Sequence, residues 1–273
     1  MKETLIRSFS GALYVLLLIV CIQYKLPLII LFFIFGIISL IEFKKLIQLK
    51  SNTPYFIFVI IYTAFSYWII NPQYVKGIDE IKQILMVLSI FVELFLIKDL
   101  FSQSIIPLFS TKRFILTTFY ITTSFVFLIL IADYNTVYDA NILLSCFILI
   151  WVNDSFAYLV GKNFGKQKLF EKISPKKTVE GFLGGLFFSC VASYFISTFA
   201  PSLTFTNWLI LSIIISVFGT LGDLIESKFK RQANVKDSGA IMPGHGGLLD
   251  RLDSIIFAAP FIYLFLRIIK YVS

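Results

Sequence analysis

Residues 219–254 carry the densest mixture of acidic, basic and glycine residues in the chain. Four polar side chains there recur at i, i+3, i+4 and i+7, a spacing that places them on one helix face: Asp223, Glu226, Ser227 and Lys230. Carboxylates without a set of Cys or His partners favour a hard cation such as Mg²⁺. Because a basic side chain shares this face, the helix could hold a phosphate beside the metal.

A loop and a second helix face follow this cluster. Their acidic and basic side chains are Lys236, Asp237, Asp250, Arg251 and Asp253. Residues 243–247 form a turn of low side-chain bulk, which lets the backbone approach a ligand. Carboxylates beside lysines and arginines suit phosphoryl transfer, because catalysis there depends on positioning and charge neutralisation. The segment therefore predicts a folded site for a metal and phosphates.

Two other titratable residues have less specific interpretations. His245 is the one histidine in the sequence, and a lone histidine cannot build a zinc site. General acid–base chemistry, hydrogen bonding and structural support all stay open for it. Glu93 stands alone in an apolar run, five residues before Lys98, so snorkelling or a local ion pair is the simpler interpretation.

A second polar cluster begins at Asp154, inside another apolar run. Tyr158 lies at i+4 and Lys162 one turn further, so the three side chains share a helix face. We expect this face to line a water-filled cavity, because an isolated carboxylate within a membrane helix is costly. A hydrogen-bonded packing site between helices is the alternative.

Residues 174–185 follow a lysine-rich stretch and predict the start of a further helix. Ser174 and Pro175 are typical of a helix N-cap and first turn. Lys177 and Thr178 would then lie beside free backbone N–H groups that favour anions, which indicates a phosphate-binding element. Glycines at 181, 184 and 185 predict close packing of this helix against a neighbour.

Composition decides which elements must position these residues. Of 273 residues, 58% are hydrophobic and 15% are charged, whereas average soluble domains carry about 25% charged residues. A soluble fold of this length could not bury so much apolar surface. Soluble enzymes, disordered chains and nucleic-acid-binding modules are therefore excluded despite the net charge of +8. Three dispersed cysteines within apolar runs indicate packing residues: Cys21, Cys146 and Cys190.

The apolar runs predict an all-α, polytopic integral membrane protein with about nine transmembrane helices. A membrane span needs about 20 apolar residues, and the runs that qualify or nearly so are 8–24, 26–43, 55–70, 82–98, 114–132, 141–161, 181–199, 207–225 and 254–272. Lys25 and Pro27 interrupt the first pair, which could form a helical hairpin or one interrupted helix.

The distribution of basic residues predicts the orientation. With a cytoplasmic N-terminus, the segments assigned to the inside hold 19 of the 24 lysines and arginines, as the positive-inside rule requires. We expect a multi-pass protein of the cell membrane, surrounded by membrane lipids, with its site facing the cytoplasm. We expect one membrane domain over 1–273, with scaffold helices in 1–140 and a catalytic half in 141–273.

Several motifs between about residues 150 and 260 match a known family in order and spacing. The main ones, within 227–254, are Ser227-x-Phe229-Lys230-Arg231, Lys236-Asp237-Ser238-Gly239 and Pro243-Gly244-His245-Gly246-Gly247-x-x-Asp250-Arg251-x-Asp253-Ser254. Upstream stand Asp154-Ser155-x-Ala157-Tyr158, Gly161, Gly165-Lys166 and Ser174-Pro175-x-Lys177-Thr178-x-x-Gly181. These motifs resemble those of the phosphatidate cytidylyltransferases, or CDP-diacylglycerol synthases. Phe156 departs from the family, which often has a small residue there, and the first 140 residues match only in hydrophobicity.

The resemblance implies that CTP and phosphatidate react to give CDP-diacylglycerol and pyrophosphate. It implies Mg²⁺, with room for a second cation, and it suggests a homodimer. Metal ligation carries over to Asp223 and Asp250. The other candidate catalytic residues are Lys230, Arg231, Lys236, Asp237, His245, Arg251 and Asp253. The candidate substrate-binding residues are Asp154, Tyr158, Ser174, Lys177, Thr178, Ser227, Gly246 and Gly247.

Two other classes of function remain open at this point. A CTP-dependent lipid-alcohol kinase would use similar parts on a similar scaffold. A cation transporter would also place carboxylates such as Asp154 and Asp223 within spans. A transporter has less need of the basic, glycine-rich loop over 226–253, which favours an enzyme.

Overall fold

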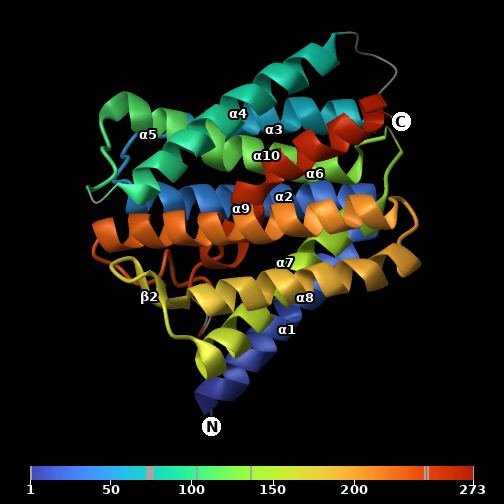
Figure 1. Ribbon diagram of the computed structural model, residues 1–273. Coiled ribbons are helices and arrows are strands. Elements are labelled where there is room, and N and C mark those ends of the chain that lie inside the picture. Colours follow the sequence, from blue (N-terminus) through green and yellow to red (C-terminus); the bar gives the residue numbers. More distant parts are fainter. Residues whose placement is uncertain are drawn as a thin grey trace.

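The structure, a computed structural model, describes residues 2–71, 77–102, 104–135, 137–242, 244 and 246–272. Its helices are α1 (Lys2–Ile22), α2 (Lys25–Leu46), α3 (Thr53–Ile70), α4 (Ile78–Phe101), α5 (Ser110–Leu116), α6 (Thr123–Ala132), α7 (Ala140–Phe164), α8 (Val179–Phe199), α9 (Phe205–Gln232) and α10 (Leu249–Val272). One short hairpin lies at the edge of the molecule, beside the start of α8 (Figure 1). A π-helical turn, η2 (Thr117–Thr122), joins α5 and α6 into one rod. The all-α class is confirmed.

Within the described residues, seven helical segments are long and apolar enough to cross a membrane. They are α2, α3, the rod from α5 to α6, α7, α8, α9 and α10. The expected spans 8–24 and 82–98 correspond to α1 and α4, which fall outside this set; the apolar part of α1, Phe9–Ile22, is shorter. The protein is therefore polytopic, and the count of nine spans stays a prediction.

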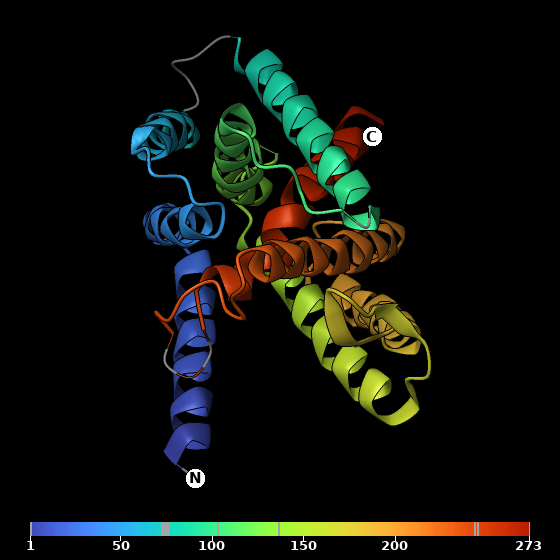
Figure 2. The same cartoon turned by 90° about the vertical axis from the view of Figure 1, so that its left-hand side faces the viewer.

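A short turn before Lys25 separates two distinct helices. Helix α1 ends at Ile22, and α2 begins at Lys25. Figure 2 shows α1 running lengthwise while α2 and α3 are seen nearly end-on, so α1 is steeply inclined to them. Residues 8–43 thus form two inclined helices joined by a short turn rather than one interrupted helix.

The loops that we expect on the cytoplasmic side lie together at one end of the helical bundle, where hydrogen bonds connect them. Arg113 donates to the carbonyl oxygen of Gln48 at 3.0 Å, and Lys228 donates to that of Ser102 at 2.8 Å. At the other end Lys25 pairs with Asp133 at 2.8 Å. The basic loops therefore share one end of the molecule, as the charge pattern predicts; the side of the membrane on which they lie stays a prediction.

The buried core connects the N-terminal helices with the C-terminal helices that carry the polar site residues. The rod from α5 to α6 and helix α10 are the most enclosed spans. The Phe43 ring on α2 lies edge-on to Tyr120 of η2 and to Phe229 of α9, with centroid distances of 5.4 and 5.2 Å. Helix α2 therefore packs directly against the helix that carries Asp223 and Lys230.

The expected helix start at Ser174 is wrong. Strands β1 (Lys168–Phe170) and β2 (Ser174–Thr178) form an antiparallel hairpin, with Phe170 opposite Ser174 and Lys168 opposite Thr178. Helix α8 begins only at Val179, because the Thr178 hydroxyl caps it by accepting from the Gly181 N–H at 3.1 Å. Extended backbone before a proline is favoured for Ser174, which suits a strand better than a helix.

Candidate active site

The site is built around a close crossing of α9 and α10. Gly222 makes this crossing possible, because a Cβ there would lie 2.6 Å from the Phe257 Cβ and 2.8 Å from the Asp253 carbonyl oxygen. These contacts are shorter than any normal carbon contact, so only glycine fits. The crossing places Asp223, the next residue on α9, beside the acidic first turns of α10.

Strand β2 brings a lysine to Asp223. The Lys177 Nζ lies 2.5 Å from Oδ2 of Asp223, while the Ser227 hydroxyl donates to Oδ1 at 3.2 Å. Burial would lower the pKa of Lys177, but the charge of Asp223 and its hydrogen bond raise the pKa above its ordinary value. Lys177 is therefore a firmly protonated cation at the site.

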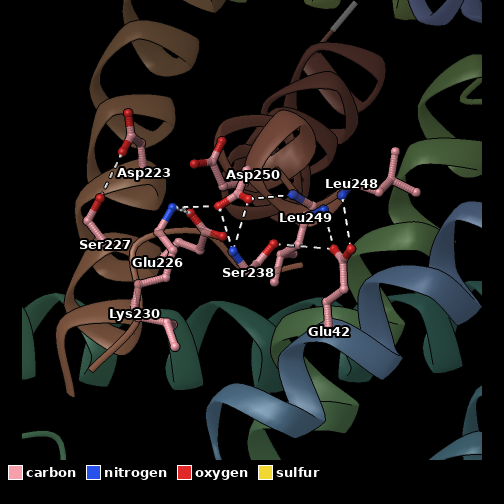
Figure 3. A network of polar contacts seen from close by, with 12 residues as sticks. Glu42, Asp223, Glu226, Ser227, Lys230, Ser238, Leu248, Leu249 and Asp250 are labelled. Carbon is pink, nitrogen blue, oxygen red and sulfur yellow. Dashed lines mark hydrogen bonds and ion pairs between the residues drawn. The ribbon is translucent and has the colours of Figure 1, made fainter. Parts of the chain in front are cut away.

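Lys230 links α9 to the start of α10 in the same way. Its Nζ lies 2.5 Å from Oε2 of Glu226 and 2.7 Å from Oδ1 of Asp250 (Figure 3). The Asp250 carboxylate also accepts from the backbone N–H of Ser238 at 3.0 Å and of Gly247 at 2.7 Å. Asp250 therefore ties together the α9 helix, the loop after it and the start of α10.

Helices α7 and α8 form the opposite wall. A Cβ at Gly181 would lie 2.7 Å from the Ala157 carbonyl oxygen, and one at Gly185 would lie 2.6 Å from that of Asn153. The glycines therefore allow the close helix packing that the sequence predicts. Next to this contact, the Lys162 Nζ lies 5.9 Å from the centre of the Tyr158 ring.

These elements enclose a cavity of about 640 Å³. Its polar lining includes nine of the residues singled out by sequence: Asp154, Tyr158, Lys162, Lys177, Thr178, Asp223, Asp250, Arg251 and Asp253. The expectation that Asp154, Tyr158 and Lys162 line one cavity is confirmed. A smaller hollow of about 410 Å³ shares Arg251 with the first and is also lined by Lys236, Asp237 and Gly246.

Several expected site residues lie elsewhere or behind the cavity wall. Arg231 lines neither hollow, and its guanidinium donates to the carbonyl oxygens of Ile173 and Val235. Ser174 lies in β2 and is not among the lining residues. His245 lies outside the described residues. The structure tests the chemical role of none of the candidate site residues, so all of these roles stay predictions.

The donor set at the cavity fits a magnesium ion. Among the described residues, no group of three or more acidic, His or Cys side chains is arranged as a ready metal site. Asp223 and Asp250 nevertheless line one cavity, and both carboxylates are held by lysines. Mg²⁺ is commonly bound by one or two carboxylates together with substrate phosphates and water. Two carboxylates beside a cavity with room for phosphates match this mode of Mg²⁺ binding.

Glu42 is the residue that sequence reasoning missed. It lies on α2, is only 1% exposed, and its carboxylate reaches the start of α10. The signal available was a carboxylate inside the apolar run 26–43, although the adjacent Lys44 and Lys45 give it the appearance of an ordinary span end. Nothing local connects it with residues some two hundred positions later.

The fold and the cavity define a polytopic membrane protein with a paired acidic and basic pocket of the kind that phosphoryl transfer uses. A family model described as the cytidylyltransferase family matches residues 4–269. The phosphatidate cytidylyltransferase of Bacillus subtilis (strain 168) is 36% identical over 276 residues, which cover 98% of each chain. Those of Staphylococcus aureus (strain COL) and Staphylococcus haemolyticus (strain JCSC1435) are each 48% identical over 126 residues, 45% of this chain and 48% of theirs. The chain therefore belongs to the cytidylyltransferase family, which confirms the resemblance.

Proposed function

We propose that this membrane enzyme transfers CMP from CTP to phosphatidate, giving CDP-diacylglycerol and pyrophosphate. The family supports this activity, and one structural observation carries it: two carboxylates that line one cavity, Asp223 and Asp250, are each paired with a lysine, Lys177 and Lys230 respectively. Such a site can neutralise phosphates with its lysines while its carboxylates accept a cation.

The reaction needs little acid–base chemistry from the protein. A phosphate oxygen of the lipid attacks the α-phosphorus of CTP, a new P–O bond forms, and the bond to the β-phosphate breaks as pyrophosphate leaves. The attacking oxygen is already anionic near neutral pH, so no strong general base is required. The main obstacle is repulsion between two anions, which basic side chains reduce.

The basic side chains at the cavity have distinct positions for this task. Lys177 enters the cavity from β2 and Arg251 faces both hollows. Lys230 lies behind the lining at the junction of α9 and α10, where it contacts Asp250. We assign Lys177 and Arg251 to phosphate contacts, and Lys230 to holding Asp250 and the leaving phosphates. Lys236, at the smaller hollow, extends this basic surface toward the loop.

Asp223 and Asp250 would hold Mg²⁺, which when bound supplies charge stabilisation to the phosphates. The two carboxylates are positioned by different neighbours: Ser227 orients Asp223, while backbone N–H groups orient Asp250. A second cation and a homodimer remain part of the proposal as the family resemblance implies them.

We further propose that the cavity faces the cytoplasm, where CTP is found. The loops with most of the basic residues share the cavity's end of the bundle, and basic loops are retained inside. The lipid substrate can then reach the site from the cytoplasmic leaflet, because Tyr158 on α7 lines the cavity and is also exposed at the protein surface.

Labelled CTP tests the reaction by showing which phosphorus is attacked. Purified protein with Mg²⁺ and phosphatidate should move label into the lipid from α-labelled CTP and not from γ-labelled CTP. An Asp223→Asn variant, which keeps the size of the side chain, should lose this transfer. Transfer of label from the γ position alone would identify a lipid kinase instead. No transfer from either position would contradict both enzyme functions and favour a cation transporter.

A further inference from the structure

Glu42 lies far in sequence from the helices that line the cavity, but its carboxylate is hydrogen-bonded to Ser238 and to the start of α10. Its Oε2 accepts from the Leu249 N–H at 2.8 Å, and its Oε1 accepts from the Leu248 N–H at 3.1 Å (Figure 3). The Ser238 hydroxyl donates to Oε2 at 3.3 Å. All three bonds cross from α2 to residues of the C-terminal half.

These bonds provide the cap that α10 cannot supply for itself. The first N–H groups of a helix have no partner within the helix and are normally satisfied by a side chain just before it. Here that place is occupied by Leu248, whose apolar side chain cannot accept a hydrogen bond. Gly247 before it leaves room for Glu42, because a Cβ at Gly247 would lie 2.1 Å from the Ser238 Oγ and 2.7 Å from Oε2 of Glu42. A carboxylate from another helix therefore takes over this role, and its charge also suits the positive end of the helix dipole.

The same short segment holds Asp250. Ser238 donates its hydroxyl to Glu42 and its backbone N–H to Asp250, and Gly247 donates its N–H to Asp250. Within this turn, Glu42 therefore accepts from the N–H groups of Leu248 and Leu249, and Asp250 accepts from that of Gly247. A shift of this turn would move the Asp250 carboxylate together with the donors that orient it.

We propose that Glu42 is a positioning residue for the reaction: its carboxylate holds the turn over 247–249 and Ser238, and thereby fixes the Asp250 carboxylate that binds the divalent cation. Glu42 itself does not touch the substrate, because its oxygens are occupied by three donors and it lines neither hollow. This inference rests on the proposed function for the role of Asp250.

The test compares Glu42→Gln with a matched control, Glu93→Gln. The amide keeps the shape of Glu42 but presents an NH₂ group to N–H donors, so the turn loses part of its support. Glu93 is also fully buried in the scaffold half, yet neither of its oxygens has a hydrogen-bond partner among the described residues. Both variants make the same chemical change in a buried carboxylate, and only the first touches the turn.

Binding of Mn²⁺, followed by electron paramagnetic resonance on the purified protein, reports the metal site without turnover. Loss of a group that orients a metal ligand typically costs about 10–100-fold in metal affinity. We expect Glu42→Gln to weaken Mn²⁺ binding by such a factor, to raise the Mg²⁺ concentration needed for half-maximal activity equally, and to leave the KM for CTP at saturating Mg²⁺ near that of the wild type. Glu93→Gln should match the wild type in all three measurements.

Ser238→Ala serves as a milder variant if Glu42→Gln does not fold. It removes one of the three bonds to Glu42 and leaves the backbone bonds in place, so it should weaken Mn²⁺ binding a few-fold. Wild-type Mn²⁺ affinity in whichever of the two variants folds would overturn the proposal, as would a wild-type protein that binds no Mn²⁺. Failure of CTP transfer with the Mn²⁺ effect intact would refute the proposed function and leave the positioning role standing.

Discussion

Replacing Gly222 by alanine should damage activity far more than stability. The new Cβ would lie 2.6 Å from the Phe257 Cβ and 2.8 Å from the Asp253 carbonyl oxygen, whereas ordinary contacts begin at 3.4 Å. The difference requires α9 and α10 to separate by roughly 0.8 Å. Overpacking of this kind costs about 1–3 kcal/mol, part of which is offset by the higher helix propensity of alanine.

The effect on the reaction follows from what each helix carries. Asp223 lies on α9 and Asp250 on α10, so the separation changes the distance between the two proposed metal ligands. A displacement near 1 Å in a catalytic arrangement can cost about 10²-fold in rate. We therefore expect Gly222→Ala to reduce label transfer from α-labelled CTP by about 100-fold while the protein remains folded in detergent.

The matched control lies one turn away on the same helix. A Cβ at Gly219 would lie 3.5 Å from the Ser254 Cβ and 3.8 Å from the Ser254 carbonyl oxygen, which is ordinary contact. Gly219→Ala should therefore retain wild-type turnover and unfold at an equal or higher temperature. Full activity in Gly222→Ala, or an equal loss in Gly219→Ala, would refute the argument that the helix crossing sets the geometry of the site.

Three further predictions concern the metal, a cation and the topology. Asp250→Asn should lower CTP transfer on the order of 10²–10³-fold in a Mg²⁺ titration, and recovery of normal turnover at any Mg²⁺ concentration would argue against ligation. Lys177→Met should lower the thermal midpoint by a constant amount from neutral pH upward, because the raised pKa of Lys177 keeps its ion pair with Asp223 intact until the pH exceeds the ordinary value of 10.5; a difference that already vanishes near pH 9 would contradict this. In a background without native cysteines, a cysteine at Gln167 should react only from the cytoplasmic side and one at Ser202 only from outside, and labelling of both from one side would break the assigned topology.

The spans and most of the cavity could be predicted because their signals are local. Apolar runs of membrane length identify the helices, and helical spacing alone places Asp223, Ser227 and Lys230 on one face. The same reasoning finds Asp154 and Tyr158, since a polar face within an apolar run must meet water or a partner. These inferences need only one helix at a time.

The errors arise where a distant group decides the outcome. The Ser174–Pro175 pair suits either a helix start or a strand, and the hairpin is selected by its neighbours. Glu180 on α8 accepts from the backbone N–H groups of Lys166 and Gln167, which fixes the chain leading into β1. Glu42 was missed for a related reason, because its partners are more than 190 residues away and no spacing rule connects them.

The lysine–carboxylate pairs give each lysine of the site a partner of opposite charge within the protein itself. Lys177 forms an ion pair with Asp223, and Lys230 forms ion pairs with Asp250 and Glu226. Under the proposed function, binding of the nucleotide with its cation would be an exchange of partners, in which the ammonium groups pass from carboxylates to phosphates. The exchange can also run backward after the reaction: as pyrophosphate leaves, each lysine regains a nearby anion. Carboxylates of the enzyme itself would thereby ease the release of an anionic product from its lysines.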